Sequence, residues 1–360
     1  MKGLVLSITA GQGHNQTAMV ISKRFNECGV ECKYLDVYKF INPILSDSVN
    51  KIYLMSTKAI PKIYGGVYRM CEKRGVQSGA GIHGLNRITN SVLSRSLIKL
   101  IQKEKPDFII CTHIFAALLV TYISSIERLN AKTIGVITDF TIHPYWEDSL
   151  LDYYIIANER LTIQGIKKGF PENKFLPLGI PIGTKFSRKI EKSKAKEILN
   201  LHSKHTILVM SGSMGFGAVY KEIEELDKLD MDFEIVSVSG NNKKLKTKID
   251  SMETRKKIYS YGYINNVDVF MDACDCIITK PGGLTTSEAL AKQIPMLINN
   301  PIPGQEDRNV EFLLNAGAAM RISSTNPIDE AVYQMFVNDD RMKLCLLYTS
   351  PSPRDMRRSR

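Results

Sequence analysis

The sequence predicts an α/β protein built from two doubly wound parallel-sheet domains. Apolar runs rich in β-branched residues alternate with stretches of helical periodicity, and several runs end in glycine-rich turns. This rhythm is typical of βαβ units, whose parallel sheets carry helices on both faces. With 360 residues, 44% of them hydrophobic, the chain can build two cores. Proline and glycine interrupt the rhythm at 177–183, so we predict domains over 1–178 and 179–343.

The predicted elements follow this rhythm along the chain. In the first domain the apolar runs predict strands over 3–9, 108–111 and 133–137. The second domain reads in order as strand 206–210, helix 217–229, strand 233–238, helix 242–256, strand 258–261, helix 266–273, strand 275–279, helix 284–293 and strand 295–299. Residues 344–360 have no period and end in four arginines against one aspartate, so we expect a non-native tail at a truncated reading frame.

The net charge of +11 is unevenly distributed. Residues 51–105 hold eleven Lys and Arg against two Glu, a net +9, with tyrosines between them. Such a composition is expected at an anionic lipid surface, and solvated helix faces fit it equally well. Nucleic acid is not expected, because no nucleic-acid-binding motif accompanies the charge. No apolar stretch approaches the ~20 residues of a membrane span, and the seven scattered cysteines are expected to be reduced thiols of a cytosolic protein.

The strongest motif is KPGGLTTSEAL at residues 280–290, where a predicted strand ends in Pro-Gly-Gly and opens into a helix. Glycines let the backbone approach a ligand closely, and the free N–H groups of a first helical turn suit a pyrophosphate. A carboxylate one turn further in can accept two hydrogen bonds from a ribose diol. The alternative is an ordinary strand-to-helix turn. The residues assigned to this ligand are Lys280, Gly282, Gly283, Leu284, Thr285, Thr286 and Glu288.

Three other loops in the second domain are candidates for the same ligand. The polar loop 299–309 has side chains that match sugar hydroxyls, or that could simply cap a helix. A glycine-rich turn at 212–218 can supply N–H donors, and the loop 261–264 can place backbone groups against a base, or be a plain connection. The residues assigned here are Gln305, Glu306, Asn309, Gly212, Ser213, Tyr263 and Ile264.

Near the start, TAGQGHNQTA at residues 9–18 joins a strand to a helix through Gly11 and Gly13, which we assign to the same ligand. His14 follows at the helix start, where the dipole disfavours its protonation, so we predict that it is the general base. A nicotinamide-dinucleotide fold is the alternative, because Asp36 closes the second strand where a ribose carboxylate is expected. Against it, Gln16 replaces the third glycine of that fingerprint.

The segment VITDFTIHPYW at 136–146 places polar and aromatic residues beyond the end of a strand, the edge where open α/β sheets bind ligands. We predict that Asp139 orients the base or the acceptor hydroxyl, and that His143, Tyr145 and Trp146 contact the acceptor. Metal binding is not expected, because no third ligand is evident nearby.

These motifs together resemble glycosyltransferase family 28, specifically the bacterial processive diacylglycerol glucosyltransferases and the plant monogalactosyldiacylglycerol synthases. The resemblance is carried by GQGHNQTA, VITDFTIHPYW, LGIPI and ITKPGGLTTSEALAKQIPMLINNPIPGQEDRN, and it runs to about residue 320. The PGQE loop after a KPGG helix separates this group from dehydrogenases. One departure is Gln12, which stands where the plant relatives carry an all-glycine turn.

The resemblance implies the GT-B fold, in which two Rossmann-like domains face each other across a cleft. It places acceptor and membrane contacts on the N-terminal domain and UDP-sugar on the C-terminal domain. It also implies inversion at the anomeric carbon with no metal or cofactor. The expected activity is transfer of glucose from UDP-glucose to diacylglycerol or glycosyl-diacylglycerol by a cytoplasmic enzyme peripheral to the inner face of the cell membrane.

Other activities remain open. A monogalactosyldiacylglycerol synthase would use UDP-galactose, and the related N-acetylglucosaminyltransferase of peptidoglycan synthesis would use a polyprenyl-pyrophosphate acceptor. A non-catalytic UDP-sugar sensor would bind the nucleotide without turnover.

Overall fold

A computed structural model describes residues 1–9, 12–41, 93–202, 205–210, 212 and 218–337. The chain divides into two compact units. Unit 1 comprises Met1–Pro181 with Ile302–Gln305, and unit 2 comprises Ile182–Pro301 with the chain from Glu306 onwards. Most of the basic stretch 51–105, and the tail 344–360, lie outside the described residues.

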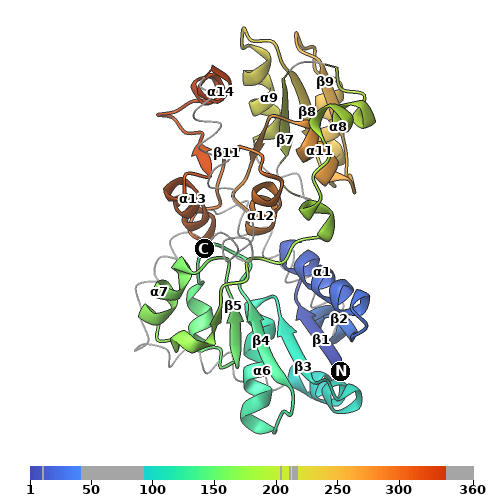
Figure 1. Ribbon diagram of the computed structural model, residues 1–360, viewed down its shortest axis with the longest axis vertical. Helices are drawn as coiled ribbons and strands as arrows, with labels where there is room; N and C mark the ends of the chain where they lie inside the picture. Colours follow the sequence, from blue (N-terminus) through green and yellow to red (C-terminus); the bar gives the residue numbers. More distant parts are fainter. Residues whose placement is uncertain (10–11, 42–92, 203–204, 211, 213–217, 338–360) are drawn as a thin grey trace. The chain divides into compact units, whose positions relative to one another are not determined.

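Unit 1 contains one six-stranded sheet with all its strands parallel (Figure 1). Its elements are β1 (Lys2–Ser7), α1 (Gly13–Glu27), β2 (Glu31–Asp36), α2 (Val37–Ile41), β3 (Phe108–Cys111), α6 (Ile114–Ile126), β4 (Lys132–Val136), the 3-10 turn η1 (Pro144–Asp148), β5 (Tyr153–Ile155), α7 (Arg160–Lys167), the 3-10 turn η2 (Glu172–Lys174) and β6 (Phe175–Leu176). Residues 93–104 are also helical.

The two faces of this sheet bury different residues, as the alternation along a strand requires. Leu4 and Leu6 of β1 point to the core shared with α6 and with the helix over 93–104. Val5, between them, points to the smaller core under α1. Helices therefore cover both faces, and the predicted doubly wound class is confirmed.

Unit 2 repeats the plan with a second six-stranded parallel sheet. Its elements are the 3-10 turn η3 (Thr184–Ser187), α8 (Lys192–Leu199), β7 (Thr206–Met210), α9 (Val219–Asp227), β8 (Glu234–Val238), α10 (Lys243–Asp250), β9 (Ile258–Tyr261), α11 (Val267–Ala273), β10 (Cys276–Thr279), α12 (Gly283–Lys292), β11 (Met296–Ile298), α13 (Gln305–Asn315), β12 (Ala319–Arg321) and α14 (Ile328–Val337).

One predicted element of unit 2 is wrong over its second half. The helix expected over 242–256 ends at Asp250. The carboxylate of Asp227 accepts hydrogen bonds from the backbone N–H groups of Arg255 and Lys256, at 3.1 and 2.8 Å. This contact holds the following segment out of the helix and leads it into β9.

Each sheet has one point at which the order of strands reverses. The order in unit 1 is β2-β1-β3-β4-β5-β6, so the reversal lies between β1 and β3. The order in unit 2 is β12-β11-β10-β7-β8-β9, so the reversal lies between β7 and β10. Ligands of open α/β sheets bind at the carboxyl ends of the strands beside such a point.

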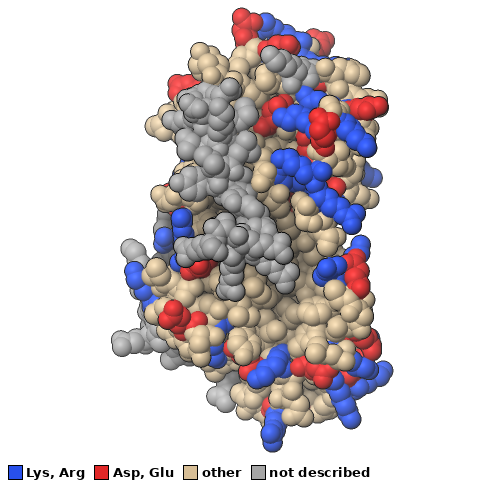
Figure 2. All heavy atoms as spheres, viewed as in Figure 1, with Lys and Arg blue, Asp and Glu red and all other residues tan. Residues whose placement is uncertain are grey.

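None of the helices in the described part of the chain is both long and apolar enough to cross a bilayer. Figure 2 shows that Lys and Arg are interspersed with Asp and Glu on the face in view.

Candidate active site

The reversal point of unit 1 brings together the loops that follow β1 and β3. His14 is the second residue of α1, and Thr112 and His113 follow β3 directly. The Thr112 hydroxyl donates to the backbone carbonyl of His14 over 3.0 Å, which ties the two loops together. The predicted base therefore lies at the edge where this type of sheet binds ligands.

The hydrogen-bond partners of His14 indicate which tautomer it adopts. Its Nδ1 lies 3.1 Å from the backbone carbonyl oxygen of Thr112. A carbonyl oxygen can only accept, so we assign the ring proton to Nδ1. The hydroxyl of Thr138 lies 2.8 Å from the same nitrogen. The assignment leaves Nε2 with its lone pair, which is the form that a general base needs.

The surroundings keep His14 uncharged. Burial lowers the pKa of His14 below its ordinary value of 6.5, while the charge of Asp139 and the hydrogen bond to Thr112 act in the opposite direction. The charge of Asp139 therefore favours the protonated form of His14.

Two further histidines adjoin His14, and sequence reasoning missed one of them, His113. The rings of His14 and His113 are nearly perpendicular, with centroids 4.7 Å apart. The Nδ1 of His113 accepts from the Phe115 backbone N–H, and that of His143 accepts from the Tyr145 backbone N–H, each over 3.2 Å. Burial lowers the pKa of His113 well below 6.5 and that of His143 to about 4. Both rings are therefore neutral with the proton on Nε2. The position of His113 just after a predicted strand was the signal that could have identified it.

The predicted acceptor residues of the segment 136–146 differ in exposure. His143 and Tyr145 are half-buried, with ring centroids 5.0 Å apart. Trp146 is only 5% exposed and packs edge-on against Tyr154 in the core. Gly135 makes room for its ring, because a Cβ there would lie 2.8 Å from it. We therefore correct the assignment of Trp146 to the acceptor: it is a core side chain.

Asp36, which suggested a dinucleotide-binding alternative, is engaged within the protein. Its carboxylate accepts from the Thr9 hydroxyl, from the Asn15 side-chain amide over 3.4 Å and from the Lys39 backbone N–H over 3.1 Å. Asn15 also donates to the Thr9 hydroxyl over 2.7 Å. Asp36 therefore braces both sides of the turn before α1, a use that does not favour ribose binding.

The reversal point of unit 2 carries the KPGG motif. Lys280 to Gly282 follow β10, and α12 begins at Gly283. Gly282 provides no side-chain cap, so the N–H groups of Gly283, Leu284 and Thr285 have no acceptor within the helix. A helix start of this kind binds phosphate through its N–H groups and its dipole. Gly212, just after β7, has a φ of +67° that favours glycine.

Two predicted ligand contacts in this region need correction. The Thr286 hydroxyl is buried and donates to the Gly282 carbonyl over 2.8 Å, as helical threonines often do. Asn309 is fully buried, and its amide donates to the carbonyl of Pro281 over 2.9 Å. Both side chains therefore hold the turn in place instead of facing a ligand.

Glu288 lies one turn into α12, as expected for a ribose contact. Burial raises its pKa to about 7, with a smaller opposing effect of Lys185 and a reinforcing one of Asp268. Lys185 of η3 pairs with Asp268 of α11 over 3.3 Å and donates to the backbone carbonyl of Asn265. A half-buried carboxyl beside this pair is suited to receive hydroxyl donors from a sugar.

The other predicted residues have less structural support. Gly13 begins α1, Glu306 lies half-buried in the first turn of α13, and Tyr263 and Ile264 follow β9 with Tyr263 54% exposed. Gly11, Ser213 and the side chain of Gln305 lie outside the described residues. These assignments stay predictions.

Glu222 of α9 is a second residue that sequence reasoning missed. It is 4% exposed and accepts from the side-chain amides of Asn299 and Asn300, over 2.7 and 3.1 Å. Burial raises its pKa to about 7, and the charge of Lys280 is among the opposing influences. Glu222 therefore braces the loop after β11 beside the KPGG turn. No sequence pattern distinguishes it from Glu224 and Glu225 of the same helix, which are half-buried and exposed.

We expect Glu222→Gln to remove a pH dependence of stability. The folded pKa of about 7 exceeds the ordinary 4.5, so this stabilisation is complete below pH 4.5 and is lost as pH rises through 7. Between pH 4.5 and 8 the wild type should lose, relative to the variant, on the order of 3 kcal/mol. Glutamine can still accept both asparagine amides. Urea unfolding at several pH values measures the difference, with exposed Glu197→Gln as the control; a pH-independent difference for Glu222→Gln contradicts the assignment.

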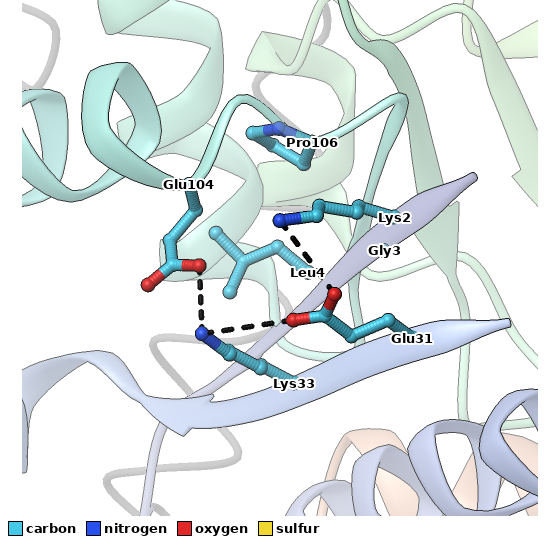
Figure 3. A pocket seen from close by; sticks show the side chains of 7 residues that line it. All are labelled: Lys2, Gly3, Leu4, Glu31, Lys33, Glu104 and Pro106. Carbon is cyan, nitrogen blue, oxygen red and sulfur yellow. Dashed lines mark hydrogen bonds and ion pairs between the residues drawn. The ribbon is translucent and has the colours of Figure 1, made fainter.

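A small pocket in unit 1 lies at the opposite edge of the sheet, at the amino ends of its strands (Figure 3). Lys33 bridges Glu104 over 2.7 Å and Glu31 over 3.9 Å, and Lys2 pairs with Glu31 over 3.6 Å. These charges compensate one another at the surface, so the pocket is not a candidate active site. Among the residues described, no group of three or more His, Cys, Asp or Glu gathers as a metal site would require.

In comparisons with known proteins, each half of the chain matches a family model. Residues 14–182 match the family model of monogalactosyldiacylglycerol (MGDG) synthase, and residues 206–343 match the glycosyltransferase family 28 C-terminal domain. The processive diacylglycerol beta-glucosyltransferase of Bacillus pumilus (strain SAFR-032) is 29% identical over 354 residues, covering 95% of this chain and 88% of that protein. Its counterpart from Bacillus cereus (strain AH187) is 27% identical over 348 residues, covering 95% and 87%. The structure resembles Acinetobacter baumannii MurG with a TM-score of 0.61 and 15% identity, covering 97% of this chain and 93% of that one.

Proposed function

Because the chain belongs to glycosyltransferase family 28 and is a UDP-sugar glycosyltransferase, we propose that it transfers glucose from UDP-glucose to diacylglycerol. The names of its relatives support diacylglycerol as the acceptor and glucose as the sugar. The same names support processivity, so we include the addition of further glucose units to the product. We place the enzyme on the cytoplasmic face of the membrane that holds its acceptor.

The hydrogen bond between Nδ1 of His14 and the carbonyl of Thr112 carries the catalytic part of the proposal. It leaves Nε2 free to take the proton of the acceptor hydroxyl. The deprotonated oxygen forms a bond to the anomeric carbon of glucose, and the bond from that carbon to UDP breaks. Asp139 stabilises the charged His14. A single displacement of this kind inverts the anomeric configuration.

In unit 2, the N-terminus of α12 would bind the UDP diphosphate and stabilise the negative charge that develops as it departs. Glu288 would accept the ribose hydroxyls. Backbone donors and a helix dipole supply this stabilisation without a cation, so the proposal assigns no metal.

The proposal is tested with vesicles that contain phosphatidylglycerol and diacylglycerol, supplied separately with radiolabelled UDP-glucose, UDP-galactose or UDP-N-acetylglucosamine. Label should enter the lipid phase from UDP-glucose, and EDTA should not prevent it. Preferred use of UDP-galactose would identify a galactosyltransferase. Labelling only when polyprenyl-pyrophosphate lipid replaces diacylglycerol would overturn the proposed acceptor. Binding of UDP without labelling would indicate a sensor.

A further inference from the structure

Helix α7 has an outward face of unusual composition. Ile163 lies three residues after Arg160, and Ile166 and Lys167 lie three and four residues after Ile163, so all four share one side of the helix. All four are exposed, Ile163 by 64% and Ile166 by 46%. Two exposed isoleucines between two cations form a surface with both apolar and positively charged groups, which we call the α7 face.

The opposite side of α7 is fixed to the protein by close packing. Leu161 is buried in the core, and Gly165 packs so closely on Phe175 that a Cβ would lie 2.1 Å from the ring. The α7 face is therefore held outward by the packing of its other side. The isoleucines cannot turn inward without loss of that packing.

The same helix holds the segment that carries the predicted acceptor residues. The Gln164 side chain accepts from the Ile142 backbone N–H over 2.9 Å and donates to the Thr141 hydroxyl over 3.1 Å. Lys168 pairs with Glu147, and both side chains are largely covered. These contacts lie on both sides of His143 in the sequence, so α7 and the acceptor segment form one packed structure.

We propose that the α7 face docks on an anionic lipid bilayer and thereby positions the acceptor segment at the membrane surface. The inference rests on the proposed lipid acceptor. The isoleucines would enter the boundary between headgroups and acyl chains, and Arg160 and Lys167 would contact lipid phosphates. Within residues 159–168 the only acidic residue is Glu159, so cations prevail and match an anionic surface.

Vesicle sedimentation tests this surface directly. Wild-type protein should bind phosphatidylglycerol vesicles more strongly than phosphatidylcholine vesicles. The double variant Ile163→Ser/Ile166→Ser should reduce the partition coefficient by roughly tenfold or more, because two apolar side chains no longer enter the bilayer. Arg160→Gln/Lys167→Gln should reduce it by about tenfold on anionic vesicles only, since each cation near such a surface contributes binding. Ile198→Ser, which removes a 52% exposed isoleucine from α8 of unit 2, is the matched control and should bind like wild type.

Activity measurements separate this inference from the proposed function. With a short-chain diacylglycerol in detergent micelles, the double-serine variant should react at the wild-type rate, while its rate on vesicle-embedded diacylglycerol falls with its binding. If neither the wild type nor any variant transfers sugar, the proposed function fails. The sedimentation result still decides whether the α7 face binds membranes. Unchanged vesicle binding by the double-serine variant overturns the inference. The inference is also overturned if wild-type protein self-associates and the double-serine variant loses this self-association but still binds vesicles.

Discussion

Replacement of His14 by glutamine should lower the turnover rate by about 10²- to 10⁴-fold, the usual contribution of a positioned general base. Glutamine can still donate a hydrogen bond to the carbonyl of Thr112, but it cannot accept a proton from the acceptor hydroxyl. The dissociation constant for UDP should not change, because the proposed contacts with its diphosphate and ribose come from α12 in unit 2 and not from the His14 side chain. Steady-state kinetics with UDP-glucose and diacylglycerol, together with calorimetry of UDP binding, measure the two effects.

The pH dependence of the wild type gives a more specific signature of the same base. The pKa of His14 is lowered from 6.5, so its neutral form persists through neutral pH, and kcat/KM should fall only at more acidic pH. The negative charge of Asp139 raises this pKa, so Asp139→Asn should move the acid limb to still lower pH. His202→Gln, at an exposed histidine of unit 2, is the matched control and should change neither quantity. Wild-type activity in His14→Gln would remove His14 from the mechanism.

Replacement of Lys292 by methionine should lower the free energy of unfolding by about 3–5 kcal/mol, because it leaves a buried carboxylate without its counter-ion. The Lys292 and Asp272 side chains are both fully buried, with Nζ and Oδ2 2.5 Å apart. Lys292 also donates to the Arg188 carbonyl, and Asp272 accepts from the Ile190 backbone N–H. The pair therefore anchors the last turn of α12, whose first turn forms the proposed diphosphate site.

Guanidinium unfolding followed by circular dichroism measures this loss. The double variant Lys292→Met/Asp272→Leu should recover most of the stability, since apolar replacement of a whole buried pair is often neutral or better. The exposed pair Lys246–Asp250 of α10 offers a comparison, and Lys246→Met should cost only about 0.5 kcal/mol. If Lys292→Met also lowered the free energy of unfolding by only about 0.5 kcal/mol, the buried ion pair would not anchor the last turn of α12.

Periodicity predicted the elements well where local pattern and tertiary structure agree. The strands Phe108–Cys111 and Thr206–Met210 have the bounds that were expected, because short apolar runs with β-branched residues suit buried parallel strands. The helix expected over 242–256 was too long, because its end is set by the carboxylate of Asp227, which is distant in sequence. Local propensity contains no information about such a contact.

Site residues were predictable where they come directly after the end of a predicted strand. His14 and the KPGG turn lie at the two reversal points, as strand-to-helix turns of this class require. Whether a side chain faces a ligand or the protein interior was not predictable. An aromatic or amide group can do either, and Trp146 and Asn309 are both buried in the interior. Lys292 and Glu222 illustrate the same limit, since burial of a charge depends on partners from other elements.

The anomeric configuration of the lipid product tests the central claim most directly. We would incubate wild-type protein with ¹³C-labelled UDP-glucose and diacylglycerol vesicles, isolate the glycolipid and determine its linkage by NMR. Direct displacement assisted by His14 predicts a β-glucosyl diacylglycerol from the α-linked donor. An α-glucosyl product, or the absence of any labelled diacylglycerol, would contradict the account.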